Sequence, residues 1–319
     1  MDEPLTRPPP KNGVEMRLIS AVACAVAALI VAGSPAAAVA LDVVTTTEGL
    51  ASLVREVGGN RVSVTSLSRG TQDPHFVDAS PAVAVKIRRA QLLVDVGLDL
   101  EVGWLPGLVN VSRNADVQPG GKGRLTAATA VQVVEAPTGP VDRSQGDIHP
   151  GGNPHFLSDP RRAEQVAQAI AAKLSQLDPA GAAQYEAQLS AFDKKLAAAR
   201  RGWEEKLAPI RGRAVITHHR TLSYFLDWAG LTVAGYLEPK PGTPPPPSHI
   251  AELVGIAKAR GVKAILVENY YDQRPAEVLA KHSGARVLSI PGDVGGAPEA
   301  KDWFSWVDLL VTRIVEANR

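Results

Sequence analysis

Cysteine is almost absent from this chain of 319 residues, and Cys24, the one present, lies in an apolar run near the N-terminus. A product that begins after this run has no cysteine, so we expect neither disulfide bonds nor thiolate metal ligands. Charge of one sign is lacking too, because 34 Lys and Arg against 33 Asp and Glu leave a formal net charge of +1. Such a chain lacks the excess of positive charge that is typical of proteins that bind nucleic acid or an anionic membrane.

Several short motifs of enzymes are also missing. The sequence contains no His-Glu-x-x-His helix, no Walker phosphate loop, no dinucleotide glycine fingerprint and no Gly-x-Ser-x-Gly elbow. Any metal site must therefore be assembled by the fold from residues that are distant in the sequence.

The N-terminus has the pattern of an export signal. Met16-Arg17 precedes an apolar run at residues 18–32, and Ala38-Val39-Ala40 is a small-residue cleavage signature. The run is about 15 residues long, short of the roughly 20 that span a bilayer. We therefore predict that residues 1–40 are a signal peptide, with Met16 as the true initiator, and that a soluble periplasmic product begins near Leu41.

The rest of the chain alternates strand-like and helical segments, which is typical of α/β lobes with mainly parallel sheets. About 280 residues suffice for two lobes, so we predict an N-terminal lobe at 41–178, a linking helix at 179–207 and a C-terminal lobe at 208–319. Strands are expected at residues 41–46, 61–67, 91–96, 131–134, 214–216, 232–236, 264–267 and 285–288.

The linking helix is predicted from one apolar stripe at spacings of three and four residues, on a segment that is otherwise charged. At 1.5 Å per residue the helix is about 43 Å long, enough to run along both lobes. A coiled-coil partner is the alternative, but a stripe of under four heptads between α/β units favours packing within the chain. A rigid helix of this kind limits hinge motion.

Four potential metal ligands follow strand-like runs. His75 and His155 share one local design, with Pro before and Phe after, in Asp73-Pro74-His75 and Asn153-Pro154-His155; His219 and Asp293 each follow a later strand. Ligands of open α/β sheets collect beyond the carboxyl ends of the strands, so two facing lobes bring these loops to one cleft. The sequence predicts a four-coordinate site of three imidazoles and a carboxylate.

The remaining histidines are weighed by position. Only one of His218 and His219 can face an ion, because successive strand residues point to opposite faces. His149 lies in a Pro/Gly/Asp-rich loop and is read as solvent-exposed, with a role in handing on metal as the alternative. His249 and His282 fall on predicted helices and are read as surface residues. Glu268 is a rival for the carboxylate position or a group that orients a histidine.

The ordered set of motifs resembles one family. Val43-Val44-Thr45-Thr46, Asp73-Pro74-His75, Asn153-Pro154-His155, His219 with Tyr224-Phe225, Glu268 and Asp293 together are similar to the zinc/manganese-type (cluster A-I) solute-binding proteins of ABC transporters, over residues 41–319. The resemblance implies two lobes, one rigid linking helix and a single metal between the lobes. It assigns His75 and His155 to the first lobe, His219 to the second, and Asp293 as the carboxylate. Many zinc-binding relatives carry a His-rich loop, whereas residues 135–152 hold only His149.

The sequence therefore predicts a monomeric periplasmic protein that binds a divalent metal as cargo and delivers it to an ABC-transporter permease, with no reaction of its own. Three imidazoles and one carboxylate suit tetrahedral Zn²⁺, whereas Mn²⁺, the alternative, prefers more oxygen donors. Two other classes stay open: a secreted zinc-dependent hydrolase, in which Glu268 is the general base, and an envelope adhesin that the metal stabilises.

Overall fold

The first strand of the chain is largely buried on both faces. In the computed structural model, which describes residue 1, residues 40–139, residue 146 and residues 148–319, β1 (Leu41–Thr45) is buried at four of its five positions. A strand of this kind fits a parallel sheet whose two faces are covered by helices. Ala40–Arg319 form one compact unit, and no helix of the described residues is long and apolar enough to cross a membrane. Residues 2–39 of the predicted signal peptide, with Met16 and Cys24, lie outside the described residues.

The first lobe is built on a parallel sheet with the order β2-β1-β3-β4. The helices beside the sheet lie between strands in the sequence, as the alternation of segments predicts. The elements are β1, α2 (Glu48–Gly58), β2 (Val62–Ser66), α3 (Pro81–Arg89), β3 (Leu92–Asp95), α4 (Leu105–Ser112), β4 (Arg124–Thr126) and α5 (Pro160–Leu177).

The second lobe repeats the design with the parallel order β6-β5-β7-β8. Its elements are β5 (Ala214–Thr217), α7 (Ser223–Ala229), β6 (Thr232–Tyr236), α8 (Pro247–Arg260), β7 (Ala264–Glu268), α9 (Arg274–Ser283), β8 (Arg286–Ile290) and α10 (Trp303–Asn318). Short 3₁₀ turns occur at Gly59–Arg61, Ala115–Val117, Ala127–Ala130, Pro179–Gly181 and Ala208–Ile210. The prediction of two α/β lobes with parallel sheets is confirmed.

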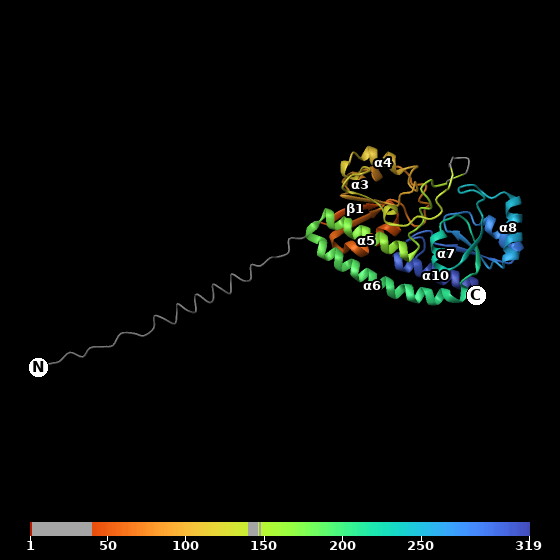
Figure 1. Ribbon diagram of the computed structural model, residues 1–319. Helices are drawn as coiled ribbons and strands as arrows, with labels where there is room; N and C mark the ends of the chain where they lie inside the picture. The colour runs from red at the N-terminus through yellow and green to blue at the C-terminus, as the bar shows by residue number, and fades with distance from the viewer. Residues whose placement is uncertain (2–39, 140–145, 147) are drawn as a thin grey trace. The chain divides into compact units, whose positions relative to one another are not determined.

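The predicted long helix is present as α6 (Ala182–Leu207), 26 residues or about 39 Å of helix. Its apolar stripe is buried, with Tyr185, Phe192, Trp203 and Leu207 among the buried residues. The helix contacts α2 and α5 of the first lobe and α10 of the second, and Figure 1 shows it running past both lobes. The stripe therefore packs within the chain, as predicted.

The strand predicted at residues 131–134 is wrong, and β4 forms earlier in the chain instead. The backbone of this apolar run bonds to groups outside the sheet. Val134 N–H donates to the Tyr224 hydroxyl at 3.0 Å, and Val134 C=O accepts from Asn153 N at 3.0 Å. These bonds join the segment to the second lobe and to the loop that carries His155.

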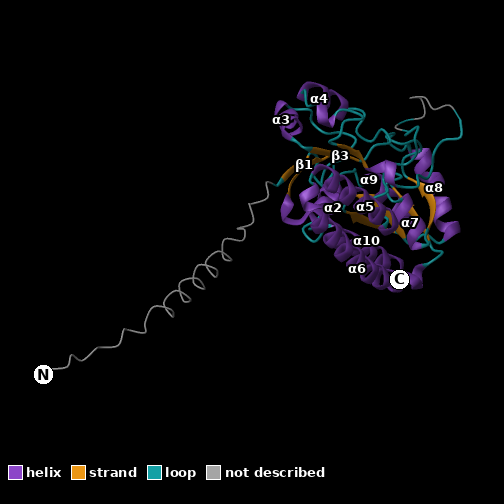
Figure 2. Ribbon diagram, turned by 60° about the vertical axis from the view of Figure 1, so that its left-hand side comes forward, coloured by secondary structure: helices purple, strands orange, loops and turns teal. Residues whose placement is uncertain are grey.

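One apolar core continues from the first lobe into the second. Figure 2 shows α6 and α10 beside α2 and α5, and α10 contacts both α2 and α6. Trp303, at the start of α10, is fully buried; its backbone N–H donates to Ser52 Oγ and its indole Nε1 donates to the Leu157 carbonyl, both at 2.8 Å. The C-terminal helix thereby binds the two lobes together.

Candidate metal centre

His75 is fixed by the aspartate two residues before it. Asp73 Oδ1 accepts from His75 N at 3.0 Å and lies 2.7 Å from His75 Nδ1, while the Pro74 carbonyl accepts from Trp104 Nε1 at 3.0 Å. Burial raises the pKa of Asp73, but the hydrogen bond from His75 outweighs it and the pKa is lowered. The charged carboxylate thus holds a proton on Nδ1 and leaves Nε2 of His75 free to bind a metal.

His155 is held by the same kind of turn. Asn153 Oδ1 accepts from His155 N at 2.8 Å, and the amide of Asn153 donates to Glu135 and to the Arg220 carbonyl. The Tyr224 hydroxyl donates to the Asn153 carbonyl at 2.8 Å. Burial and then the neighbouring imidazoles hold the pKa of His155 well below its usual range, so its ring is neutral. His155 Nε2 is buried without a hydrogen-bond partner among the described residues.

His219 comes from the second lobe, directly after β5. Its Nδ1 lies 2.6 Å from Glu238 Oε2, and both residues are buried. Burial raises the pKa of Glu238, but hydrogen bonds from His218 and His219 prevail and lower it to about 2. Glu238 therefore orients His219 with Nε2 free. The preceding His218 also approaches this carboxylate, with Nε2 3.6 Å from Glu238 Oε1, and its ring stacks on Tyr271 with ring centres 4.2 Å apart.

The three histidines converge from separate loops. The ring centres of His75 and His155 are 5.2 Å apart, and His219 lies 5.6 Å from the first and 5.4 Å from the second. A buried nitrogen without a partner and two imidazoles oriented by carboxylates are a donor set that fits a borderline-soft cation such as Zn²⁺.

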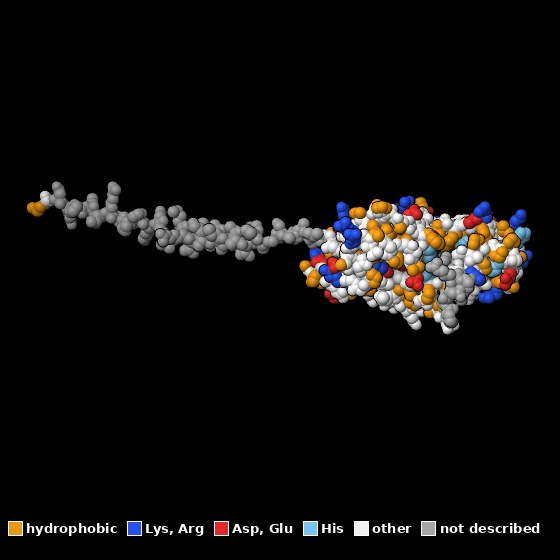
Figure 3. Space-filling view, turned by 90° about the horizontal axis from the view of Figure 1, so that it is seen from above, with side chains coloured by type: hydrophobic (Ala, Val, Ile, Leu, Met, Phe, Trp, Pro, Cys, Tyr) orange, Lys and Arg blue, Asp and Glu red, His pale blue; other side chains and the backbone are white. Residues whose placement is uncertain are grey.

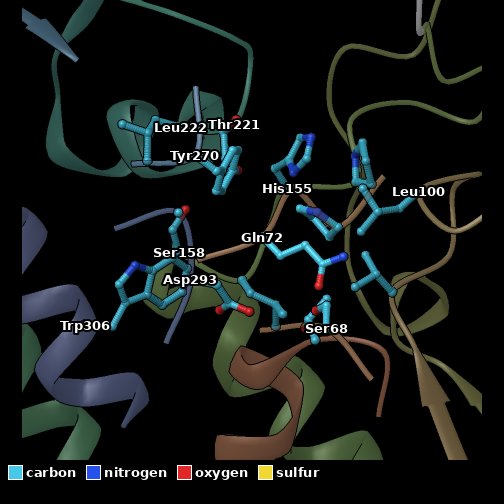
Figure 4. A pocket seen from close by; sticks show the side chains of 16 residues that line it. Ser68, Gln72, Leu100, His155, Ser158, Thr221, Leu222, Tyr270, Asp293 and Trp306 are labelled. Atoms are coloured by element: carbon cyan, nitrogen blue, oxygen red, sulfur yellow. The ribbon is translucent and has the colours of Figure 1, made fainter. Parts of the chain in front are cut away.

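Asp293 lies in the same region, but its carboxylate is engaged with backbone. Its oxygens accept from Gly49 N at 3.0 Å and from Val294 N at 2.8 Å, so it sits at the N-terminus of α2. Burial raises its pKa to about 7. In Figure 4 Asp293 and His155 line one pocket and their side chains point in different directions. Its role as a metal ligand stays a prediction.

His149 is closer to the cluster than the sequence indicated. Its Nε2 lies 3.2 Å from His75 Nε2, and potential donor atoms of His75, His149 and His155 all lie within 4.8 Å of one another. Burial and then His75 and His219 lower the pKa of His149 to about 4. The expectation of plain solvent exposure is wrong, because this loop residue folds back onto the first lobe. No spacing or strand-end signal in the sequence marks it.

The other candidates have surroundings of their own. His282 is exposed on α9, as predicted. His249 is half-buried and not a plain surface residue, because its Nε2 contacts the Tyr236 carbonyl at 2.9 Å. Glu268 is buried at the end of β7, and neither carboxylate oxygen has a hydrogen-bond partner among the described residues. Burial raises its pKa.

A hollow beside the histidines links them to solvent. It is lined by Glu135, His149, His155, His219 and Arg220, among others. Figure 3 shows histidine side chains at the surface in the view from above. The hollow therefore borders His149 together with His155 and His219.

Comparison with known proteins adds an independent line of evidence. Residues 43–317 match the family described as the periplasmic component A of the zinc-uptake complex. The manganese ABC transporter substrate-binding lipoprotein PsaA of Streptococcus pneumoniae is 24% identical over 85% of each chain. The zinc-binding lipoprotein AdcA of the same species is 24% identical over 77% of this chain and 48% of its own length. A crystal structure of ZnuA aligns with a TM-score of 0.72 and 23% identity, covering 88% of this chain and all of the other.

Proposed function

Because the chain belongs to the family of periplasmic zinc-uptake components, which are solute-binding proteins of metal ABC transporters and not enzymes, we propose that its cargo is Zn²⁺. It binds one ion between its lobes, outside the cytoplasm, and presents it to a membrane permease. We further propose that it acts as a monomer in the periplasm. Membership of this family also excludes the secreted hydrolase as its role.

The observation that carries this proposal is the convergence of three imidazoles. His75, His155 and His219 come from both lobes, and their ring centres lie 5.2 to 5.6 Å apart. Asp73 and Glu238 each contact an Nδ1 atom, at 2.7 and 2.6 Å, which leaves the Nε2 atoms as donors. A neutral imidazole oriented by a carboxylate is a common zinc ligand.

The choice of zinc over manganese follows from the donors. Relatives at similar identity are named for manganese and for zinc, so similarity alone leaves the metal open. Mn²⁺ favours oxygen donors, whereas imidazole suits Zn²⁺, and Zn²⁺ also stands above Mn²⁺ in the general order of affinities. A nitrogen-rich shell therefore favours zinc on both grounds.

Two groups compete for the fourth position of the shell. The sequence predicts Asp293 as the fourth ligand. Its carboxylate would have to give up its hydrogen bonds with Gly49 and Val294 to bind the metal. The geometry nominates His149, whose Nε2 is 3.2 Å from that of His75.

The test is metal content followed by competition. Protein purified without chelators is analysed by elemental mass spectrometry, and one zinc per chain is expected. The apoprotein is then titrated with Zn²⁺ and Mn²⁺ together. Displacement of zinc by manganese at comparable concentration would reject zinc as the cargo, and the absence of any bound metal would reject the proposal as a whole.

A further inference from the structure

We propose that His149 supplies the fourth donor, so that the cargo is held by four imidazoles, while Asp293 keeps its backbone hydrogen bonds. This inference rests on the proposed function, since it names one more residue of the same site. The loop histidine thereby becomes part of the binding shell and covers the ion on its solvent side.

The first argument is the distance between two nitrogen atoms. In a tetrahedral shell with Zn–N bonds of about 2.0–2.1 Å, neighbouring nitrogens are about 3.3 Å apart. His75 Nε2 and His149 Nε2 are 3.2 Å apart. Asp73 already occupies Nδ1 of His75, so these two Nε2 atoms can share a hydrogen bond without an ion and can both bind an ion with almost no movement.

The second argument is the spacing of the His149 ring from those of His75 and His155. Imidazoles bound through Nε2 to one tetrahedral ion have ring centres about 5 Å apart. His149 lies 5.3 Å from His75 and 6.2 Å from His155, and the three predicted histidines are 5.2 to 5.6 Å from one another. The largest of these five separations needs a shift of about 1 Å to meet this spacing.

The third argument is that the fold builds the position of His149. Its carbonyl accepts from Gly152 N at 3.0 Å, in a turn that leads into the loop of His155. Gly151 packs so closely on Leu98 that a Cβ there would lie 2.8 Å from Leu98 Cδ2, and the His149 ring also interacts with the Leu98 backbone. Leu98 itself has φ of 55°, a strained conformation that proteins often keep at binding sites.

The fourth argument concerns what Asp293 does instead. Its carboxylate accepts two backbone N–H groups, and one of them belongs to the first turn of α2. A Cβ on Gly49 would lie 2.6 Å from Asp293 Oδ1, so the glycine permits this close approach. Asp293 therefore connects the second lobe to α2 of the first lobe through its hydrogen bond with Gly49. Binding of its carboxylate to a metal would break that hydrogen bond.

The experiment counts imidazoles around zinc. X-ray absorption spectra at the zinc edge are recorded for the loaded wild type and for His149→Ala, Asp293→Asn and the control His249→Ala, whose ring lies away from the site. Four imidazoles are expected in the wild type, in Asp293→Asn and in His249→Ala, and three in His149→Ala. The zinc Kd of His149→Ala should rise about 100-fold, the upper end of the range seen for groups that only orient a ligand.

The outcomes separate this inference from the proposed function. Three imidazoles plus a non-water oxygen in the wild type, with His149→Ala at wild-type affinity, would overturn the role of His149 while metal binding stands. A larger loss of affinity in Asp293→Asn than in His149→Ala would also overturn it. Wild-type protein that binds no zinc refutes the proposed function itself. Thermal melts of the apoproteins show whether each variant is folded.

Discussion

The carboxylate of Glu238 should tune metal affinity without touching the metal. Its Oε2 lies 2.6 Å from His219 Nδ1, the pair is buried, and its pKa is lowered to about 2, so the group is charged at every working pH. Groups that orient a ligand histidine typically contribute 10- to 100-fold in affinity, or about 1.4 to 2.8 kcal/mol. We expect Glu238→Gln, which keeps an acceptor but loses the charge, near the lower value, and Glu238→Ala near the upper one.

Competition with a chromophoric chelator measures both Kd values. Glu252→Ala is the matched control, since that exposed carboxylate lies 3.6 Å from His249, outside the site. The decisive arm repeats Glu238→Ala in a His219→Ala background, where the carboxylate has no ligand left to orient and the further loss should be under about threefold. An unchanged affinity in Glu238→Ala, or an equal loss in both backgrounds, would refute the reasoning.

Three further outcomes are expected at the same site. His155→Ala should weaken zinc binding by orders of magnitude, because it removes a buried donor, whereas His282→Ala should leave the titrated Kd unchanged. Zinc affinity should fall as the pH drops below about 6.5, because protons compete for imidazoles. Burial lowers the pKa of His155 and lowers that of His149 to about 4, so these two rings contribute only at lower pH. A Kd that is flat from pH 5 to 8 would count against histidine ligation. His219→Glu should reduce the preference for zinc over manganese in a competition titration, and an unchanged ratio would place His219 outside the shell.

Local chemistry explains why two of the ligand positions could be read from the sequence. Asp73 and Asn153 each stand two residues before a histidine, and each accepts a hydrogen bond from the backbone of that histidine. Side chains of Asp and Asn make such turns with their own neighbours, and the intervening proline fixes the backbone. The design therefore needs only adjacent residues, which is why its repetition was visible before the fold was known.

Long-range contacts explain what the sequence could not reveal. No sequence motif near His149 predicts that its loop contacts His75, which lies 74 residues earlier. Glu238 lies in a proline-rich loop after β6, and His219 follows β5. The two side chains meet only because β5 and β6 pair in the folded sheet. The false strand at residues 131–134 has the same origin, since an apolar run does not disclose that its backbone bonds go to Tyr224.

The shared core sets how the ion can leave. A wide hinge opening would have to separate α10 from α2 and break the bonds that Trp303 makes with Ser52 and Leu157, all within one continuous apolar cluster. Loss of such buried contacts is costly, whereas the loop of His149 faces the hollow that leads to solvent. We therefore expect release to begin with movement of this loop and a small tilt of the lobes. Hydrogen exchange should then differ between apo and zinc-loaded protein around residues 148–155 and stay unchanged in α6; faster exchange throughout α6 on metal removal would instead indicate that the lobes separate.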